Sequence, residues 1–252
     1  MSISDRWVAD GVPADLRFYF DPVCPFCWMT SKWVRMVAAR RGYRVDWRFI
    51  ALRLVNARID YDAHFPPEYE EGHTAGLRLL RMAARTRAEQ GPAAVERLYE
   101  ALGAQIFDGE LVPDTAEDHG RRGTAAFVAP VLAAAGLPAS LADALDDPTW
   151  DAVVQAETDE ALALAGKDVG TPILQFVPPD GPAFFGPVIS RLPGQNEAEE
   201  LWDHVVALAR FPGFAELKRS LRELPQLRAL GVAEDDVGVV QDWHGGSRRP
   251  KR

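Results

Sequence analysis

Residues 16–37 read LRFYFDPVCPFCWMTSKWVRMV and contain both cysteines of the chain. The segment begins with the short aromatic run Leu16–Phe20, whose residue types favour a β-strand. From Pro25 onward, apolar residues recur at three- and four-residue spacing, which predicts a helix. Cys24 and Cys27 therefore lie where a strand runs directly into a helix, and this junction is the strongest indication of the architecture.

The segments on either side of the cysteine motif extend this pattern. The helix is expected to end at Gly42, a favourable C-cap. Alternating apolar and charged residues over 45–49 predict a second, half-buried strand. Strand signals return at 172–177 and 183–189, and the turn residues 179–181 between them predict a hairpin. The order strand, helix, strand and then hairpin indicates an α/β protein.

The middle of the chain is expected to be all-helical, because residues 66–165 contain many helix formers and no convincing strand. The four expected helices cover 66–90, 92 to about 107, 116–135 with a bend or break at Pro130, and 148–165 with Asp147 as N-cap and Gly166 beyond the end. After the hairpin, Asn196 and Glu199 resemble a capping box that opens another helix. A short helix is expected around 215–223, and the Gly-rich basic end GGSRRPKR is expected to be disordered.

These elements predict a discontinuous domain organisation. Residues 14–58 and 167–225 would form the sheet domain, and 59–166 would form a helical insertion. Residues 226–252 would be a C-terminal extension. The sequence leaves open whether the chain forms a homodimer.

Composition limits the possible partners and location. The chain has 252 residues, of which 47% are hydrophobic and 26% charged, as expected for a soluble globular protein. Its net charge of −9 argues against nucleic acid or an anionic membrane surface as a partner. The longest apolar stretch, Ala125–Leu137, is too short to span a membrane, which takes roughly 20 residues. The N-terminus lacks the pattern of a secretory signal, so a cytoplasmic location is expected.

The Cys-Pro-Phe-Cys spacing favours thiol chemistry. Cys24 would lie at the first helical turn, where unpaired backbone N–H groups and the helix dipole favour an anion. A thiol in that position has a lowered pKa and exists partly as a thiolate near neutral pH. Cys27, one turn further on, would be close enough to attack a mixed disulfide formed at Cys24. We therefore predict Cys24 as the nucleophile and Cys27 as the resolving thiol.

The cysteine pair is also compatible with two roles that involve no redox chemistry. A Cys-X-X-Cys motif can be half of a zinc site, which His64, His73 or His119 could complete, but no second cysteine pair and no suitably spaced histidine pair is present. The two thiols could also be buried and inert, although the helix-start position argues against this. The sequence predicts no metal site.

A second motif precedes the third predicted strand. In Val169-Gly170-Thr171-Pro172, a cis peptide bond before Pro172 would turn the backbone of Thr171 toward the cysteines. Its N–H and C=O could then pair with an extended substrate. Beside the cysteines, Phe26 is expected to be mostly exposed, whereas Trp28 could equally pack inward.

These motifs resemble the thioredoxin-fold proteins of the DsbA type, which carry a helical insertion. More closely, the chain resembles the actinobacterial mycothiol-dependent nitroreductase family within that group. The matching segments are FDPVCPFCWMTSKW (20–33), LVN (54–56), PPEYEEG (66–72), DVGTP (168–172), AFFGPVISRLPG (183–194) and FAELKR (214–219). They are spread over most of the chain. The resemblance implies a thioredoxin-like fold with a large all-helical insertion domain.

The resemblance also implies a function. Cys24 and Cys27 would form a disulfide that mycothiol, a low-molecular-weight thiol, reduces as co-substrate. Substrates would be small molecules such as nitroaromatics, or disulfides, bound in a pocket between the sheet domain and the insertion. Asn56 and Tyr69 match polar residues of that pocket, and Pro25, Phe26, Trp28, Thr171 and Pro172 would complete the substrate-binding set. The chain departs from the family pattern at two positions that touch the expected pocket: it has Phe26 where the family usually has Trp, and Ala57 where it usually has an acidic residue.

Two alternatives belong to other functional classes. Glutathione-transferase kappa and the chromene-carboxylate isomerases share the fold but need no resolving cysteine, so the presence of Cys27 argues against them. A non-enzymatic binding module with a structural disulfide would show slow or absent redox chemistry. No G-x-G-x-x-G motif follows a strand, so no tightly bound nicotinamide or flavin cofactor is expected.

Overall fold

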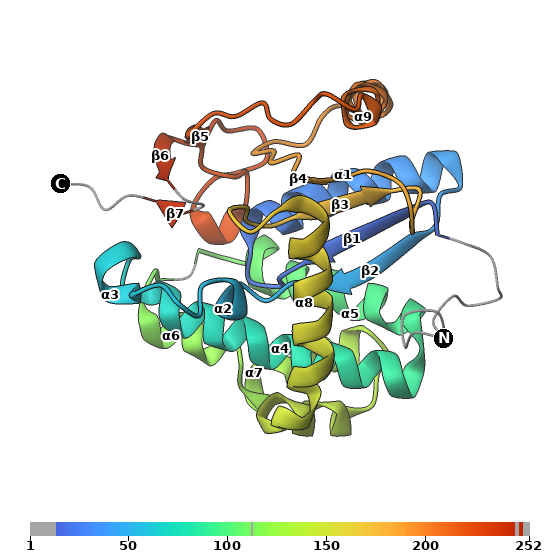
Figure 1. Ribbon diagram of the computed structural model, residues 1–252. Coiled ribbons are helices and arrows are strands. Elements are labelled where there is room, and N and C mark those ends of the chain that lie inside the picture. The colour runs from blue at the N-terminus through green and yellow to red at the C-terminus, as the bar shows by residue number, and fades with distance from the viewer. Residues whose placement is uncertain (1–13, 112, 245–246, 249–252) are drawn as a thin grey trace.

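A four-stranded sheet forms the centre of the protein (Figure 1). The computed structural model describes residues 14–111, 113–244 and 247–248. The sheet contains, in the spatial order β2-β1-β3-β4, the strands Val45–Phe49, Leu16–Phe20, Ile173–Phe176 and Ala183–Phe185. β1 and β2 are parallel, β3 is antiparallel to β1, and β4 is antiparallel to β3. This arrangement, with the motif helix after β1, confirms the predicted thioredoxin-like fold.

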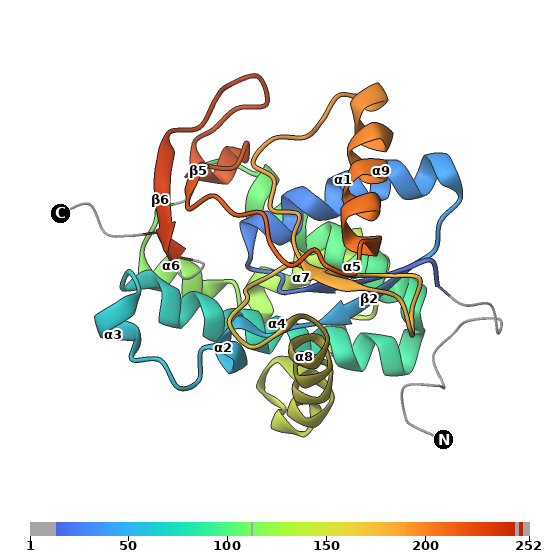
Figure 2. The ribbon, with the colours of Figure 1, turned by 45° about the horizontal axis from the view of Figure 1, so that its top comes forward.

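Helices cover both faces of the sheet (Figures 1 and 2). α1 (Pro25–Arg41) and α9 (Gln195–Arg210) lie together on one face, where the Trp33 and Trp202 rings are 5.4 Å apart between centroids. The Trp33 indole N–H also donates a hydrogen bond of 2.9 Å to the Ala198 carbonyl. On the other face, Ala161 of α8 (Asp151–Ala165) packs with Tyr19 and other buried residues. α1 ends at Gly42 in the left-handed conformation (φ 67°), as expected.

The helical insertion lies beyond β2, the edge strand (Figure 1). Its helices are α2 Leu52–Val55, α3 Tyr61–His64, α4 Glu68–Gln90, α5 Pro92–Gly103, the π-helix Ala104–Asp108, α6 Ala116–Arg121, α7 Ala125–Ala134, and the 3-10 helices Ala139–Asp146 and Pro148–Trp150 that lead into α8. The described residues between β2 and β3 contain no strand, in agreement with the sequence. The division of the chain at residues 58 and 167 stays a prediction.

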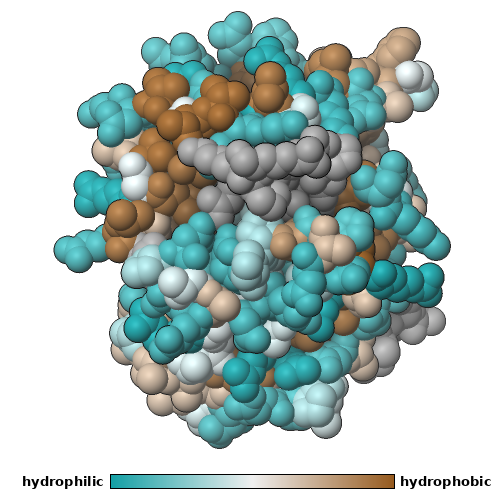
Figure 3. Space-filling view, turned by 90° about the vertical axis from the view of Figure 1, so that its left-hand side faces the viewer, coloured by the Kyte–Doolittle hydropathy of each residue, from teal (hydrophilic) through white to brown (hydrophobic). Residues whose placement is uncertain are grey.

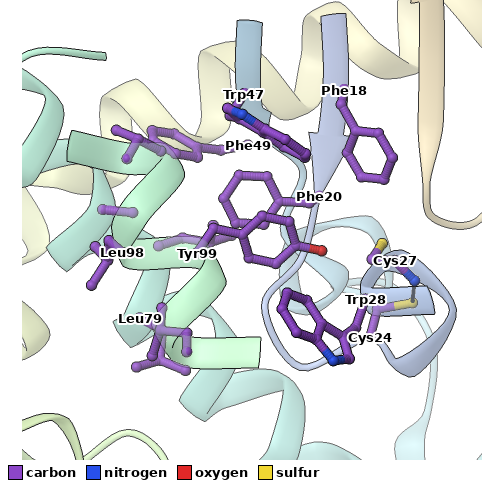
Figure 4. Packing of buried hydrophobic residues seen from close by; sticks show 14 of the residues in the cluster. Phe18, Phe20, Cys24, Cys27, Trp28, Trp47, Phe49, Leu79, Leu98 and Tyr99 are labelled. Atoms are coloured by element: carbon purple, nitrogen blue, oxygen red, sulfur yellow. Dashed lines mark hydrogen bonds between the residues drawn. The ribbon is translucent and has the colours of Figure 1, made fainter. Parts of the chain in front are cut away.

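An aromatic cluster holds α5 against the sheet (Figure 4). Tyr99 of α5 stacks on Phe20 with ring centroids 3.8 Å apart, and it meets the edge of Trp47 at 5.4 Å. Phe20 of β1 and Trp47 of β2 are both buried on the sheet face that α1 covers. Burial of each such ring contributes about 1.5–3 kcal/mol to stability. The first helices of the insertion and the motif helix therefore share one hydrophobic core with the sheet.

The helix predicted over 116–135 is broken, but not at Pro130. The break falls between α6 and α7, where the Thr124 hydroxyl accepts a hydrogen bond from the Phe127 N–H and caps α7. Pro130 lies inside α7 and does not end it. At the break, a Cβ on Gly123 would lie 3.0 Å from the Ala75 backbone of α4. Close helix packing therefore places the interruption at Gly123.

Two predictions near the C-terminus are also wrong. The capping box of α9 pairs Gly194 with Glu197, two residues before the predicted pair. No helix forms over 215–223; instead β5 (Leu221–Glu223) pairs antiparallel with β6 (Val240–His244). Of the tail predicted to be disordered, Ser247–Arg248 form β7 against β6, and the rest lies outside the described residues. Among the residues that the structure describes, no helix combines the length and apolarity that crossing a membrane requires.

Candidate active site

Cys24 caps the first turn of α1. Its backbone is extended (φ −84°, ψ 114°), and its Sγ accepts a hydrogen bond of 3.3 Å from the Cys27 N–H (Figure 4). Pro25 occupies the first helical turn, where no backbone N–H is needed. Both cysteines are free thiols; Cys24 is 6% exposed and Cys27 is fully buried. The nucleophile expected from the sequence is thus the more accessible of the two.

The second sequence motif lies against the first. The Thr171–Pro172 peptide bond is cis, as expected, and the Thr171 carbonyl oxygen lies 3.8 Å from Cys24 Sγ as the acceptor of its S–H. The Thr171 hydroxyl is buried and has no hydrogen-bond partner among the described residues. In the dithiol state the Thr171 carbonyl is therefore occupied by Cys24, and loss of the Cys24 proton would free it.

The two thiols differ in acidity because they share a set of hydrogen bonds. Burial raises the pKa of Cys24, but hydrogen bonds with the Cys27 thiol, with Thr171 and with the Cys27 N–H outweigh burial and leave this pKa below its ordinary value. Burial, together with the hydrogen bond to Cys24 and its negative charge, raises the pKa of Cys27 well above the ordinary value. A thiolate at Cys24 beside a neutral Cys27 is the arrangement that a nucleophile and a resolving thiol require.

A buried carboxyl group lies three residues before Cys24. Asp21 is fully buried and accepts hydrogen bonds from the backbone N–H groups of Val23 (3.0 Å) and Leu52 (2.7 Å). Burial raises the pKa of Asp21 to about 7, although the two hydrogen bonds oppose this rise. When ionised, Asp21 raises the pKa of Cys24 by charge repulsion. A carboxyl group whose pKa lies near neutrality is therefore close to the thiol.

A cavity opens in front of Cys24 and brings together most of the predicted site residues. The predicted residues in its wall are Cys24, Pro25, Phe26, Asn56, Tyr69 and Thr171. Tyr69 lies in the first turn of α4, where its ring stacks on Phe65 at 5.6 Å between centroids. The aromatic and aliphatic part of the wall also includes Phe65, Ile106, Phe107, Phe185, Leu224 and Trp243. The cavity therefore lies between the sheet, the helical insertion and the C-terminal part of the chain.

Three predicted residues lie outside the cavity wall. Cys27 follows Cys24 by three residues, and Pro172 directly follows Thr171. Trp28 points into the protein, is 3% exposed and donates a hydrogen bond of 3.1 Å from its indole N–H to Asp108. A Cβ on Gly103 of α5 would overlap the Trp28 ring. Trp28 thus fixes α1 to the insertion from behind and takes no direct part in the wall.

The prediction that Phe26 is mostly exposed is wrong. Residues 220–244, which we call the C-terminal segment, fold over the start of α1 and leave Phe26 only 3% exposed. Trp243 meets the Phe26 ring edge-on at 4.9 Å between centroids, and the Arg222 guanidinium lies 5.6 Å from the same ring. Figure 3 views the molecule from the side of β6 and shows hydrophobic surface gathered in its upper part. The segment contributes exposed large hydrophobic residues, namely Leu221, Val237, Val239 and Val240.

The wall also contains the polar groups His73, Asp114, His119, Arg122 and Arg222. The sequence indicated His73 and His119 only as possible zinc ligands, and it did not indicate the other three. Burial, with the nearby charges of Arg53 and His119, lowers the pKa of His73 to about 3, so His73 is neutral and its Nδ1 pairs with the Tyr61 hydroxyl at 3.0 Å. No local sequence pattern distinguishes these residues from surface histidines and arginines. Within the described ranges, no group of three or more His, Cys, Asp or Glu side chains could hold a metal ion.

Comparison with known proteins gives three findings. The sequence model of a family described as mycothiol-dependent nitroreductase Rv2466c matches residues 23–219. A protein of Mycobacterium tuberculosis, "Uncharacterized protein Rv2286c", is 32% identical over 203 residues, which cover 80% of this chain and 80% of that protein. A crystal structure of a thioredoxin-like oxidoreductase from Silicibacter pomeroyi DSS-3 is similar with a TM-score of 0.40 and 18% identity, over 77% of this chain and 87% of that chain.

Proposed function

Because this chain belongs to the Rv2466c-like family of mycothiol-dependent nitroreductases, we propose that Cys24 and Cys27 carry electrons from mycothiol to a small-molecule or disulfide acceptor. The chain is a thiol-dependent oxidoreductase, and the proposal concerns its active site, its reductant and its substrates. The observation that carries it is the position of Cys24, whose Sγ caps α1, faces the cavity and accepts the Cys27 N–H at 3.3 Å.

The reaction with a disulfide would follow two exchanges. The Cys24 thiolate attacks one sulfur of the acceptor, so that a mixed disulfide forms and the other half leaves as a thiolate. Cys27 then loses its proton and attacks Cys24 Sγ, which releases the second half and closes the Cys24–Cys27 disulfide. Two molecules of mycothiol would restore the dithiol and leave as mycothiol disulfide.

A nitroaromatic acceptor would use the same pair of electrons. Oxidation of the dithiol to the disulfide supplies two electrons and two protons, which convert a nitro group to a nitroso group and water. The predicted site residues Pro25, Phe26, Asn56, Tyr69 and Thr171 would surround such an acceptor, since all of them line the cavity. A cytoplasmic location would supply the low-molecular-weight thiol.

Replacing each cysteine separately tests the proposal. Cys24→Ser is expected to abolish mycothiol-dependent turnover of a nitroaromatic or disulfide acceptor, since an unactivated hydroxyl is a weak nucleophile and cannot form a disulfide. Cys27→Ser is expected to react once and to stop as the mixed disulfide at Cys24, which mass spectrometry of the intact protein detects. Turnover that survives in Cys24→Ser would refute the proposal. Full turnover in Cys27→Ser would instead favour the glutathione-transferase-kappa type of reaction.

A further inference from the structure

The wall of the active-site cavity has a charge opposite to that of the whole protein. The chain has a net charge of −9. Two guanidinium groups, Arg122 and Arg222, nevertheless line the cavity with one carboxylate, Asp114. Asp114 accepts a hydrogen bond of 3.0 Å from His119 Nε2. A cavity that concentrates positive charge within an acidic protein attracts anions to that place specifically.

Neither guanidinium is held by an ion pair within the described part of the chain. Arg222 donates one hydrogen bond of 3.3 Å from its Nε to the Arg219 carbonyl, which leaves its terminal N–H groups for another acceptor. Arg122 follows α6 directly and makes no side-chain hydrogen bond among these residues. Both guanidiniums are partly buried at the cavity wall, and their unused donors are available to a ligand that supplies an acceptor.

Both arginines remain protonated at neutral pH. Burial lowers the pKa of Arg122 to about 10, against the opposing charges of Asp114 and Asp118. Burial also lowers the pKa of Arg222, against the opposing charge of Cys24. The negative charge that Arg222 experiences from Cys24 places its guanidinium on the nucleophile side of the cavity, over the Phe26 ring.

The rest of the wall favours a flat, apolar body. Phe26, Phe65, Tyr69, Phe107, Phe185 and Trp243 supply aromatic surface. The C-terminal segment closes the side of the cavity above Phe26, because Trp243 packs against that ring. Aromatic surface with a few placed polar groups is the usual composition of a site for a small organic ligand.

We propose that the cavity selects aromatic acceptors that carry a carboxylate, which Arg122 and Arg222 bind while the reducible group lies at Cys24. This inference rests on the proposed function and names its substrate class. Arg222 belongs to the C-terminal segment, which lies beyond the part of the chain that the family model matches, residues 23–219. The segment thus supplies this chain with a specificity-determining residue of its own.

The test uses one exchange step, so it needs neither mycothiol nor nitro reduction. Cys27→Ser protein is mixed with 5,5′-dithiobis(2-nitrobenzoate), an aromatic disulfide with a carboxylate on each ring, or with neutral 4,4′-dithiodipyridine. In both cases the Cys24 thiolate forms a mixed disulfide and releases one aromatic thiolate, whose absorbance gives the rate constant. The quantity of interest is the ratio of the anionic to the neutral rate constant, because changes in thiolate fraction cancel in that ratio.

Arg122→Met and Arg222→Met are each expected to lower the ratio roughly tenfold, the effect of losing one charge-assisted hydrogen bond. The matched controls are Arg121→Met at the end of α6 and Arg228→Met in the C-terminal segment. Both remove exposed arginines that do not line the cavity. They should leave the ratio unchanged. Arg122→Lys and Arg222→Lys keep the positive charge, so they should retain much of the wild-type ratio of the anionic to the neutral rate constant.

Two outcomes would overturn the inference, and they are distinct. An unchanged ratio in both methionine variants would show that the arginines do not recognise the anion, while the proposed function would stand. Failure of Cys24 to react with either disulfide would refute the proposed function, and this inference with it. Should a methionine variant not fold, Arg122→Gln and Arg222→Gln give the same readout with a polar side chain.

Discussion

Two carboxyl groups are buried beside the sheet, and they differ in their partners. Glu157 of α8 lies between two guanidiniums, with Arg48 of β2 at 3.1 Å and Arg87 of α4 at 2.5 Å, and it also accepts the Phe49 N–H at 2.9 Å. Asp21, at the cysteine end of β1, accepts only the two backbone N–H groups of Val23 and Leu52 and has no cation paired with it in the described part of the chain.

The difference separates a carboxylate held by two cations from a carboxyl group held by backbone N–H groups alone. Glu157 joins β2, α4 and α8, so its charge is neutralised by the elements that it holds together. Asp21 has no such neutralisation, and burial raises its pKa to about 7. The raised pKa of Asp21 thus goes with burial in the absence of a neighbouring cation.

The largest expected effect is on the paired carboxylate. Glu157→Gln removes the charge but keeps the shape. It leaves Arg87 buried without its counter-ion and leaves Arg48 paired with Asp46 alone, at 2.8 Å. We expect the free energy of unfolding to fall by about 3–5 kcal/mol in urea denaturation. The reaction rate of Cys24 in the folded variant should not change, because the cluster lies at the far side of β2.

Glu89→Gln is the control for this variant. Glu89 is exposed and pairs with Arg85 four residues earlier on the same helix. Its loss should cost no more than about 0.5 kcal/mol. A loss below about 1 kcal/mol for Glu157→Gln would mean that the buried ion cluster does not hold the insertion to the sheet.

Local sequence signals were sufficient to predict the cysteine end of the molecule. The strand before Cys24, the helix that begins at Pro25 and ends at Gly42, and the turn before Pro172 depend on neighbouring residues only. The helices of the insertion were predicted because residues 66–165 are rich in helix formers, and Asp147, Pro148 and Gly166 marked the ends of the last one. The family resemblance added Asn56 and Tyr69, which do lie at the cavity.

The features that the sequence did not predict depend on contacts between distant residues. β5 and β6 are each short, and they form because residues about twenty positions apart pair as antiparallel strands, which local propensity does not show. The burial of Phe26 follows from the same fold of the C-terminal segment. The positions of Arg122 and Arg222 in one wall likewise require the tertiary structure.

The second prediction concerns the carboxyl group without a cation. The pKa of Asp21 in the folded protein, about 7, lies above the ordinary value of 3.8, so the folded state holds more protons than the unfolded state between these pH values. The contribution of Asp21 to the free energy of unfolding therefore decreases as pH rises through this window, by no more than about 4 kcal/mol in total.

The difference in the free energy of unfolding between wild type and Asp21→Asn isolates the contribution of Asp21, since the other carboxyl groups are common to both proteins. Urea denaturation at several pH values between 4 and 8 should show the wild type losing stability relative to the variant as pH rises. A difference that stays constant over this range would mean that Asp21 does not titrate in it, and the comparison with Glu157 would fail.

The smallest expected effect is that of Asp21 on the pKa of Cys24. Ionised Asp21 raises the pKa of Cys24 by charge repulsion, so Asp21→Asn in Cys27→Ser protein should lower the midpoint of the Cys24 thiolate titration, followed by ultraviolet absorbance. Glu70→Gln, which removes an exposed carboxylate paired with Arg53, should leave the midpoint in place. Because Asp21 is ionised in the parent protein only above about pH 7, the titration curves of parent and variant should separate in that range. A higher midpoint in Asp21→Asn would show that Asp21 acts on Cys24 through the geometry of the turn that it caps at Val23, and not through its charge.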